Sequence, residues 1–592
     1  MKNKLFRHFT PWVGAVLLAL AGAVPAARAQ TVDWARVVGQ NQIGWGISQV
    51  VADAQGNTYI CGDFSDSLVL DAFTLYAPDS VNPGNPDVFV AKLDPNGICQ
   101  WATRAGGQGL GGGGSNQGYD RASGIALDTA GNVFVTGGFD SYSAHFGSHA
   151  LYNAGPGFEL FVAKLDGATG QWLWARRAGG ANGEDIGQIV KTDAAGDAYV
   201  LGYFQSAVCQ VGTVMLTRRT YSDLLLAKLN GVTGQWIWAT RAGLGAGRPA
   251  ALAFDGRGHV FVAGSFLNPA ADFGADTLRA YSAGSGTSYV ANNQCFVARL
   301  STITGAWQWA TQGGDSNQQY GGARTNAIQV DAQGLITVAG EIDGCRIVSI
   351  GNTVLTNSSG IEPIGGRLKS DAFVAQLDSS GQWLSASAVG GGGYERVRGL
   401  VPEFGGSFCL VGTFDSPNLT IGASLLTSTT TSGYLARTDG AGTWLDASVV
   451  GSGAATYMAG LAVDGLGRRY LGGIFRGPTL QLGSTTLYNG SPNGYAGFVA
   501  RLGAGPLAVS TEQPDTPAGL AVWPNPTTGT VRVNGPAPGQ PIWLVDMQGR
   551  CVARERMPSA GSLTVVLPAR LAAGLYVVRV PGTRLTRRLV VE

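Results

Sequence analysis

The stretch Ile125-Ala-Leu-Asp-Thr-Ala-Gly-Asn-Val-Phe-Val-Thr-Gly-Gly-Phe139 contains the pattern that decides the fold. Two apolar runs flank a short link that holds Asp128 and Gly131. An Asp side chain accepts backbone hydrogen bonds in a tight turn, and Gly takes a positive φ there at no steric cost. The stretch therefore predicts a β-hairpin. The acidic residue of this link recurs along the chain, at Asp53, Asp193, Asp255, Asp331, Glu403 and Asp464.

Two further patterns recur in step with this hairpin. The first is Trp174-Ala-Arg-Arg-Ala-Gly179, and the copies that keep its Ala and its last Gly begin at Trp34, Trp101, Trp238, Trp309, Ser385 and Asp446. The second is Phe161-Val-Ala-Lys-Leu165, whose copies surround Ala91, Ala227, Ala298, Ala375, Ala436 and Ala500. Apolar and polar side chains alternate in these runs, which is typical of β-strands. The sequence predicts four short antiparallel strands in each of seven units.

The two ends of the repeated region predict how the units assemble. A four-stranded unit cannot bury both faces alone, and radial stacking of units around an axis solves this. The run 34–39 has the pattern of a fourth strand but follows no unit, and the last unit stops after its third strand at Leu502. We therefore expect residues 30–502 to form an all-β, seven-bladed β-propeller closed by the N-terminal strand, which removes two exposed edges.

The repeats resemble the β-propeller repeat family with the signature Asp-x-x-Gly-Asn-x-Tyr-Val-x-Gly. The signature is clearest in Asp53-Ala-Gln-Gly-Asn-Thr-Tyr-Ile60 and in residues 128–137. The resemblance implies a fold and little about activity, because such repeats occur in many exported proteins of undetermined role. Units six and seven depart from the pattern, with Glu403 in place of Asp and with Ser385 and Asp446 in place of Trp, so we expect those blades to be less regular.

Residues 1–29 read as a secretory signal peptide. A basic start is followed by the apolar run 13–24 and by Ala27-Arg-Ala29, which offers a cleavage pattern of small residues. The apolar run is shorter than the ~20 residues that cross a bilayer as a helix, so we expect no transmembrane segment. The positive residues gather in this leader and in the tail, and the region between them is net acidic. An acidic propeller is a poor partner for phosphate backbones, so we expect no nucleic-acid ligand.

The C-terminal residues form a separate unit. Residues 503–518, with Pro506, Pro514 and Pro517, read as a linker. Residues 519–592 resemble the C-terminal sorting domain of the type IX secretion system, and the matching blocks are 523–529 (WPNPTTG), 545–550 (VDMQGR), 571–580 (LAAGLYVVRV) and 587–591 (RRLVV). The chain ends in Glu592, where the family often has basic residues. The resemblance implies a small β-sandwich, the type IX machinery as a partner, and a protein released or attached to the outer cell surface.

The motifs of common catalytic and metal sites are missing from the sequence. It has no HExxH, GK[ST], GxSxG or CxxC. The glycine-rich run 109–114 lacks the context of a phosphate loop and reads as a connection between blades. His145 and His149 share one loop without an acidic or cysteine partner, and the recurring Asp residues read as turn caps rather than calcium ligands. We therefore predict no catalytic residue, no metal and no cofactor, and the ligand-binding residues stay unknown.

Three sets of residues have two interpretations each. The Trp pairs 172/174, 236/238 and 307/309 could stack on sugars, but their recurrence with the fold favours packing between blades. Recurring arginines could bind anions or form local salt bridges, namely Arg104, Arg177 and Arg241. Cys61 and Cys409 fall in predicted strands, where a buried thiol is the favoured interpretation. One disulfide remains an alternative among Cys209, Cys295 and Cys345, which lie in or beside predicted loops.

Antiparallel order predicts the face on which a ligand meets the propeller. The links between strands two and three, and those between blades, share one face and are long, as in 65–86, 140–157, 267–294 and 343–369. Long loops on a rigid scaffold are where recognition is usually built. The first hypothesis is a noncatalytic binding or adhesion protein for an extracellular glycan or protein. The alternative is a polysaccharide hydrolase or lyase with loop carboxylates as acid and base, and a third is a structural surface-layer component.

Overall fold

The structure is a computed structural model that describes two parts of the chain. The first is 31–503 except 43–45, 78–84, 110–117, 246, 268–269, 281–292, 315–320, 332, 362–367, 404–405 and 491–493. The second is 521–591 except 524–529, 535–537, 547–550, 559–561, 567–570, 572–573 and 581–585. The expected signal peptide, nearly all of the expected linker and most of the glycine-rich run lie outside the described residues.

The described residues form an all-β structure of small antiparallel sheets and contain no α-helix. The first three of its four-stranded units are β2 (Gly46–Ala52), β3 (Thr58–Phe64), β6 (Asp87–Leu93) and β7 (Cys99–Gln108); β8 (Asp120–Leu127), β9 (Val133–Phe139), β12 (Glu159–Leu165) and β13 (Trp172–Ala178); and β14 (Ile186–Thr192), β15 (Ala198–Phe204), β18 (Ser222–Leu229) and β19 (Trp236–Gly245). In each unit the strands pair in chain order.

Three further units have the same order. They are β20 (Arg248–Phe254), β21 (His259–Phe266), β24 (Gln294–Ser301) and β25 (Trp307–Gly313); β26 (Gly322–Val330), β27 (Ile336–Gly344), β30 (Leu368–Leu377) and β31 (Trp383–Val389); and β32 (Glu395–Pro402), β33 (Phe408–Phe414), β36 (Ser432–Thr438) and β37 (Trp444–Val450). The seventh combines both ends of the region, as β38 (Ala455–Val463), β39 (Arg469–Arg476), β42 (Tyr495–Leu502) and β1 (Val32–Gln42).

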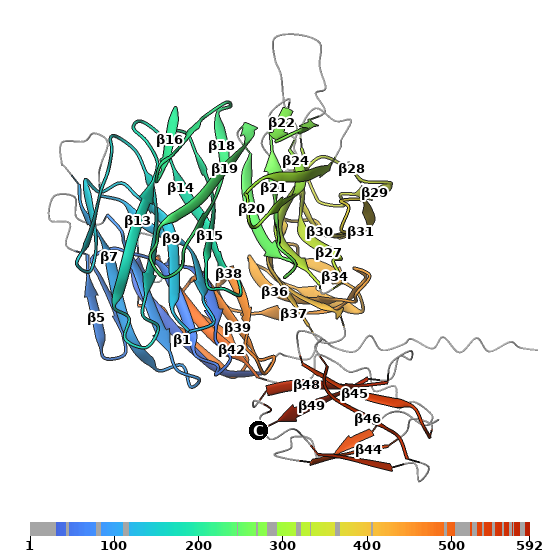
Figure 1. The fold of residues 1–592 in the computed structure, drawn as a ribbon. Coiled ribbons are helices and arrows are strands. Elements are labelled where there is room, and N and C mark those ends of the chain that lie inside the picture. The colour runs from blue at the N-terminus through green and yellow to red at the C-terminus, as the bar shows by residue number, and fades with distance from the viewer. Residues whose placement is uncertain are drawn as a thin grey trace, which may run out of the picture.

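The N-terminal strand β1 pairs where the sequence predicts. It runs antiparallel to β42, with Ala35 opposite Ala500 and Val37 opposite Phe498. Figure 1 shows blue β1 beside orange β39 and β42. The first strands of the seven units, β2, β8, β14, β20, β26, β32 and β38, are here called the inner strands. Each inner strand contacts the next, and β38 contacts β2, so the contacts between inner strands form a closed circuit.

Each link between the second and third strands of a unit contains a two-stranded hairpin that the sequence analysis missed. The hairpins are β4 (Ser67–Leu70) with β5 (Phe73–Tyr76), β10 (Ser143–Phe146) with β11 (His149–Tyr152), β16 (Val208–Val211) with β17 (Val214–Thr217), β22 (Ala270–Phe273) with β23 (Asp276–Arg279), β28 (Ile347–Ile350) with β29 (Thr353–Thr356), β34 (Asn418–Ile421) with β35 (Ser424–Thr427), and β40 (Thr479–Leu482) with β41 (Thr485–Tyr488). The expectation of four strands in each repeat was therefore incomplete.

The hairpins join neighbouring units at their outer edge. Strand β10, for example, pairs with β7 of the preceding unit, and β11 contacts β13 of its own unit. Both β4 and β41 contact β1 in the same way. A residue with positive φ turns each hairpin, namely Asp71, Gly147, Gly212, Gly274, Gly351, Gly422 and Gly483. Within the described residues, the hairpins of the long links that the sequence assigns to ligand recognition thus pack units together.

The C-terminal part contains two further sheets. One consists of β43 (Ala521–Trp523), β44 (Thr530–Asn534) and β47 (Ser562–Val566). The other pairs β46 (Cys551–Arg556), β45 (Pro541–Asp546), β48 (Gly574–Arg579) and β49 (Thr586–Val591) in that order. Buried side chains of both sheets, such as Val533 and Leu544, belong to one hydrophobic cluster. Among the described residues, no helix has the length and apolar character to cross a membrane.

Candidate functional site

A β-bulge at the same place in every inner strand creates the candidate site. The pairing of each inner strand with the second strand of its unit shifts by one residue, for example between Ala122 and Gly124. The residues skipped by these shifts are Ser48, Ser123, Gln188, Ala250, Asn326, Arg398 and Ala459. All seven line one cavity of about 640 Å³, here called the axial cavity. Bulges re-aim side chains in this way, and they are enriched next to active sites.

A second set of side chains lies two residues earlier in each inner strand. Residues at i and i+2 of a strand share a face. The earlier positions hold Gly46, Arg121, Ile186, Arg248, Arg324, Arg396 and Tyr457. Arg121, Ile186 and Arg248 line the axial cavity, and the last three line two adjoining cavities. Four arginines at equivalent positions of four units thus surround the space between the inner strands.

The two adjoining cavities differ in their lining. One has about 890 Å³ and is lined by Tyr394, Tyr457 and Tyr495, and is here called the tyrosine cavity. The other has about 240 Å³ and is lined by carboxylates and arginines. Arg398 lines all three cavities. The axial and tyrosine cavities, at about 640 and 890 Å³, both fall within the range of cavities that hold small-molecule ligands.

The cavities lie near the end where the inner strands begin and the second strands end. Arg121 is the second residue of β8, and Asp63 is the next-to-last residue of β3. The links between units and the links that carry the hairpins depart from this end. This is the face on which the sequence analysis expects a ligand.

The arginines around the cavities have two kinds of surroundings. Arg324 forms an ion pair with Asp343 at 3.1 Å, and Arg396 lies 3.6 Å from Glu341. Arg121 stacks over the ring of Phe158, and Arg248 lies 3.8 Å from the centroid of Tyr203. Arg121, Arg248 and Arg398 form no ion pair with any carboxylate of the described residues. Stacking on a ring positions a guanidinium and leaves its N–H edge available.

Burial perturbs two charged groups of the small cavity. Desolvation raises the pKa of Glu341, although Arg396, Arg398 and Arg324 oppose this effect. Desolvation also lowers the pKa of Arg398, and Glu341 opposes that. The Glu341 carboxylate, with three guanidinium groups around it, is suited to holding those groups in place. The neighbouring Asp343 holds Arg324 through its ion pair.

Six of the seven recurring acidic residues of the sequence pattern act as turn caps, as predicted, and Glu403 forms an ion pair with Arg469. Asp128 Oδ1 accepts hydrogen bonds from the backbone N–H groups of Ala130 and Asn132. Equivalent bonds form at Asp53, Asp193, Asp255, Asp331 and Asp464. Within the described parts of the chain, no group of three or more His, Cys, Asp or Glu residues could hold a metal ion. His145 and His149 lie on strands β10 and β11, and the ring of His259 contacts Asp255.

The Trp pairs pack between units rather than forming a sugar platform. Trp172 Nε1 donates to the carbonyl of Arg104 in the preceding unit. Trp174 is buried, and Gly234 of the following unit lies against its ring. The three recurring arginines form local salt bridges, at 2.9 Å from Arg104 to Asp87, 2.5 Å from Arg177 to Glu159 and 2.9 Å from Arg241 to Asp223. Of the two interpretations of these arginines, local salt bridging is therefore the one that the structure supports.

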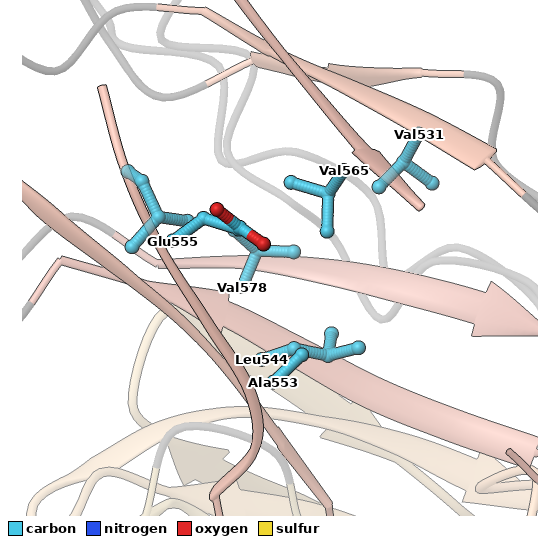
Figure 2. A pocket seen from close by; sticks show the side chains of 7 residues that line it. Val531, Leu544, Ala553, Glu555, Val565 and Val578 are labelled. Atoms are coloured by element: carbon cyan, nitrogen blue, oxygen red, sulfur yellow. The ribbon is translucent and has the colours of Figure 1, made fainter. Parts of the chain in front are cut away.

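All seven cysteines are free thiols, and six of them are buried. The disulfide left open among Cys209, Cys295 and Cys345 is absent from the structure. The interpretation of Cys61 and Cys409 as buried thiols is confirmed. Figure 2 shows a further cavity, in the C-terminal part, with Val531 and Val565 on one side and Leu544 on the other. Its volume of about 10 Å³ is that of a packing void, with room for one water at most.

The sequence analysis missed the arginines of the cavities, although a signal was present. Arg121 stands seven positions before Asp128, and the bulge residue Ser123 stands five positions before it. The same spacing relates Arg248 to Asp255 and Arg396 to Glu403. Aligning the repeats on the acidic turn residue therefore places the bulge residues in one column and the residues two positions earlier in another. The bulge interrupts the alternation of side chains, so periodicity alone could not show which residues face the axis.

Comparison with known proteins identifies the C-terminal part. Residues 521–592 match the family described as the secretion system C-terminal sorting domain. The protein is secreted or attached to the cell surface. The domain is that of the type IX secretion system, and it indicates interaction with that machinery. No curated protein matches the chain.

Solved structures share a weak likeness with the chain. A quinohemoprotein alcohol dehydrogenase from Comamonas testosteroni is 11% identical with a TM-score of 0.36, covering 83% of this chain and 79% of that one. An ulvan lyase, described as a new family of polysaccharide lyase, is 11% identical with a TM-score of 0.43, covering 78% and 97%. BamB from Moraxella catarrhalis is 11% identical with a TM-score of 0.33, covering 78% and 100%. Likenesses at this level carry no statement about function.

Proposed function

We propose that residues 30–502 form a seven-bladed β-propeller that serves as a noncatalytic, extracellular binding scaffold. The N-terminal strand closes the ring, residues 1–29 direct export, and residues 503–518 link the propeller to a β-sandwich sorting domain at 519–592. The closed circuit of contacts between the seven inner strands supports the propeller. The hydrophobic cluster shared by the two C-terminal sheets supports the sandwich.

One observation carries the binding function. All seven inner strands contribute their bulge residue to the axial cavity, which lies near the end of the ring where the long links depart. Pockets of this size on a rigid scaffold are the usual place of ligand binding. The hairpins fix the links around this end by pairing them with neighbouring units, as β10 does with β7. The scaffold therefore presents a preformed cavity, which lowers the entropy cost of binding.

Binding to an array of neutral and acidic glycans, followed by analysis of the glycans for cleavage products, tests this function. The expected result is saturable binding with no product. Absence of binding to every glycan and to extracellular protein ligands contradicts the binding scaffold and leaves a structural surface-layer role.

A polysaccharide hydrolase or lyase is the second candidate. The raised pKa of Glu341, which lines the small cavity together with Asp343, is the observation that favours it. Two carboxylates in a cavity can act as acid and base on a glycosidic bond. The ion pairs to Arg396 and Arg324 favour a structural role for both groups instead. Release of sugar products that is lost in Glu341→Gln would establish the enzyme.

A further inference from the structure

The three arginines that form no ion pair within the described residues, Arg121, Arg248 and Arg398, come from different units and line the same cavity. Arg398 is also near enough to Glu341 for that carboxylate to favour its charged form. Arg121 lies on β8, Arg248 on β20 and Arg398 on β32. The circuit of inner strands places these strands around one axis, so the three guanidinium groups approach the axial cavity from separate directions. Guanidinium groups bind carboxylate and sulfate oxygens through paired N–H donors.

From this arrangement we propose that the axial cavity binds a carboxylated or sulfated saccharide. The inference rests on the proposed binding function and names its ligand class. The low-dielectric protein walls around the cavity focus the positive potential inside it. An anionic group entering the cavity is held by Arg121, Arg248 and Arg398, while Arg324 and Arg396 remain paired with their own carboxylates.

Two described carboxylates also line the axial cavity, and neither forms an ion pair with Arg121, Arg248 or Arg398. Asp63 is only 3% exposed and lies at the end of β3. Glu184 accepts a hydrogen bond from the hydroxyl of Tyr203, at 3.4 Å. The ring of Tyr203 also carries the guanidinium of Arg248, so Tyr203 contacts both groups. The lining of this cavity therefore has three arginines against two carboxylates.

The neighbouring tyrosine cavity supports a saccharide rather than a small free anion. It shares Ser48, Arg398 and Ala459 with the axial cavity, so the two adjoin. Its Tyr457 and Tyr495 rings lie 6.2 Å apart, and the guanidinium of Arg396 lies 4.8 Å from the ring of Tyr394. Aromatic side chains combine a large apolar contact with a polar hydroxyl, which suits the faces and hydroxyl groups of sugar rings. A charged saccharide can place its carboxylate or sulfate group in the axial cavity and the adjacent sugar ring in the tyrosine cavity.

Calorimetric titration of the full protein with oligogalacturonate and with its fully methyl-esterified form tests the role of charge. Dextran sulfate and unmodified dextran form a second matched pair that tests sulfate. The expected result is that at least one charged member binds at least tenfold more tightly than its neutral partner. Its affinity should fall with added salt, because salt screens charge. Equal binding of the charged and neutral forms overturns the inference.

Substitutions locate the site. Arg398→Gln and the double variant Arg121→Gln/Arg248→Gln should each weaken binding of the charged glycan at least tenfold. Arg279→Gln removes an exposed guanidinium from hairpin β22–β23 that lines none of the three cavities, and this variant should bind like the natural protein. Cavity variants that bind as tightly as the Arg279 variant overturn the inference. If a neutral glycan binds and the cavity variants leave it unaffected, this inference fails while the proposed binding function stands.

Discussion

Gly97 lies so close to the indole ring of Trp34 that a Cβ atom on residue 97 would come within 2.7 Å of the ring. Trp34 belongs to β1, whereas Gly97 lies in the turn between β6 and β7, and Trp34 Nε1 donates to the carbonyl of Pro95 in that turn. The same contact recurs between neighbouring units, as Gly170 on Trp101, Gly234 on Trp174, Gly305 on Trp238 and Gly381 on Trp309. Strand β1 therefore takes the structural place of an outer strand in the seventh unit.

Gly97→Ala should destabilise the protein by about 2 to 4 kcal/mol. The residue has a φ of +77°, and the added methyl group would also meet the ring of Trp34. Gly256→Ala is the matched control, because Gly256 has a φ of +69° and no atom within 4 Å of the added carbon. Urea unfolding of both variants measures the difference. Equal destabilisation would show that the contact between Gly97 and Trp34 contributes nothing.

Acidic residues buried at the cavity end of the units make stability depend on pH. Glu395 is fully buried, and desolvation together with the nearby Asp371 and Asp415 raises its pKa from the usual 4.5 to about 7. Ser416 Oγ and the N–H of Gly391 donate to the carboxylate and oppose this rise. The folded state binds the proton more tightly than the unfolded state. The stability that this group contributes is therefore complete below pH 4.5 and is lost as the pH rises through 7.

The expected loss from Glu395 alone is on the order of 3 kcal/mol between pH 4.5 and pH 8. Glu395→Gln, which resembles the protonated acid, should flatten the curve of unfolding free energy against pH in that interval. Glu184→Gln removes an exposed carboxylate and serves as the control. Denaturant unfolding at several pH values gives both curves, and a Glu395→Gln curve parallel to that of the natural protein would contradict the assigned pKa.

The sequence predicts the main strands of each unit because their pattern is long and repeated. The pairing of Ala35 with Ala500 follows from two incomplete units at the ends of the region. The hairpins escaped notice because strands of four residues, such as β10, are too short for alternation to stand out. A weak signal existed in the apolar-Gly pairs at their tips, for example Phe146-Gly147 and Ile350-Gly351.

The axial site was harder to predict than the strands. A bulge inserts one residue and moves the following side chains to the opposite face. Arg396 and Arg398 share a face of β32, but the bulge at Arg398 shifts every residue after it, so alternation over the whole strand does not show that this face lines the cavities. The neighbours of an arginine also decide its role. The sequence left Arg104 open to anion binding or to a local salt bridge, and it is paired with Asp87. Arg398 had no distinguishing pattern and lines three cavities.

Removal of one partner of the buried ion pair between Asp128 and Lys164 should strongly destabilise the protein. The two groups lie 3.0 Å apart with side chains 6% and 8% exposed, and Lys164 Nζ also donates to the carbonyl of Gly231 in the next unit. Asp128→Asn keeps the acceptor of the turn but leaves the lysine charge buried without its partner. We expect a loss of about 3 to 5 kcal/mol in the free energy of unfolding.

Asp378→Asn controls for the turn itself. Asp378 accepts the N–H groups of Ser380 and Gln382 in an equivalent turn and has no ion pair among the described residues. Its substitution should cost less than about 1 kcal/mol. Chemical denaturation of both variants distinguishes the two effects, and similar losses would mean that the turn hydrogen bonds, not the ion pair, account for the stability.

Thiol reactivity should separate Cys551 from the other six cysteines. Burial raises the pKa of the Cys99 thiol to about 12 and that of Cys61 further, and a thiol that stays protonated and enclosed reacts slowly. Cys551 is only half-buried. A maleimide reagent at pH 7.5 should therefore label one cysteine in the native protein and all seven in denaturant without reductant. Fewer than seven labelled residues after denaturation would reveal a disulfide, and rapid native labelling of Cys61 or Cys409 would contradict their burial between the sheets.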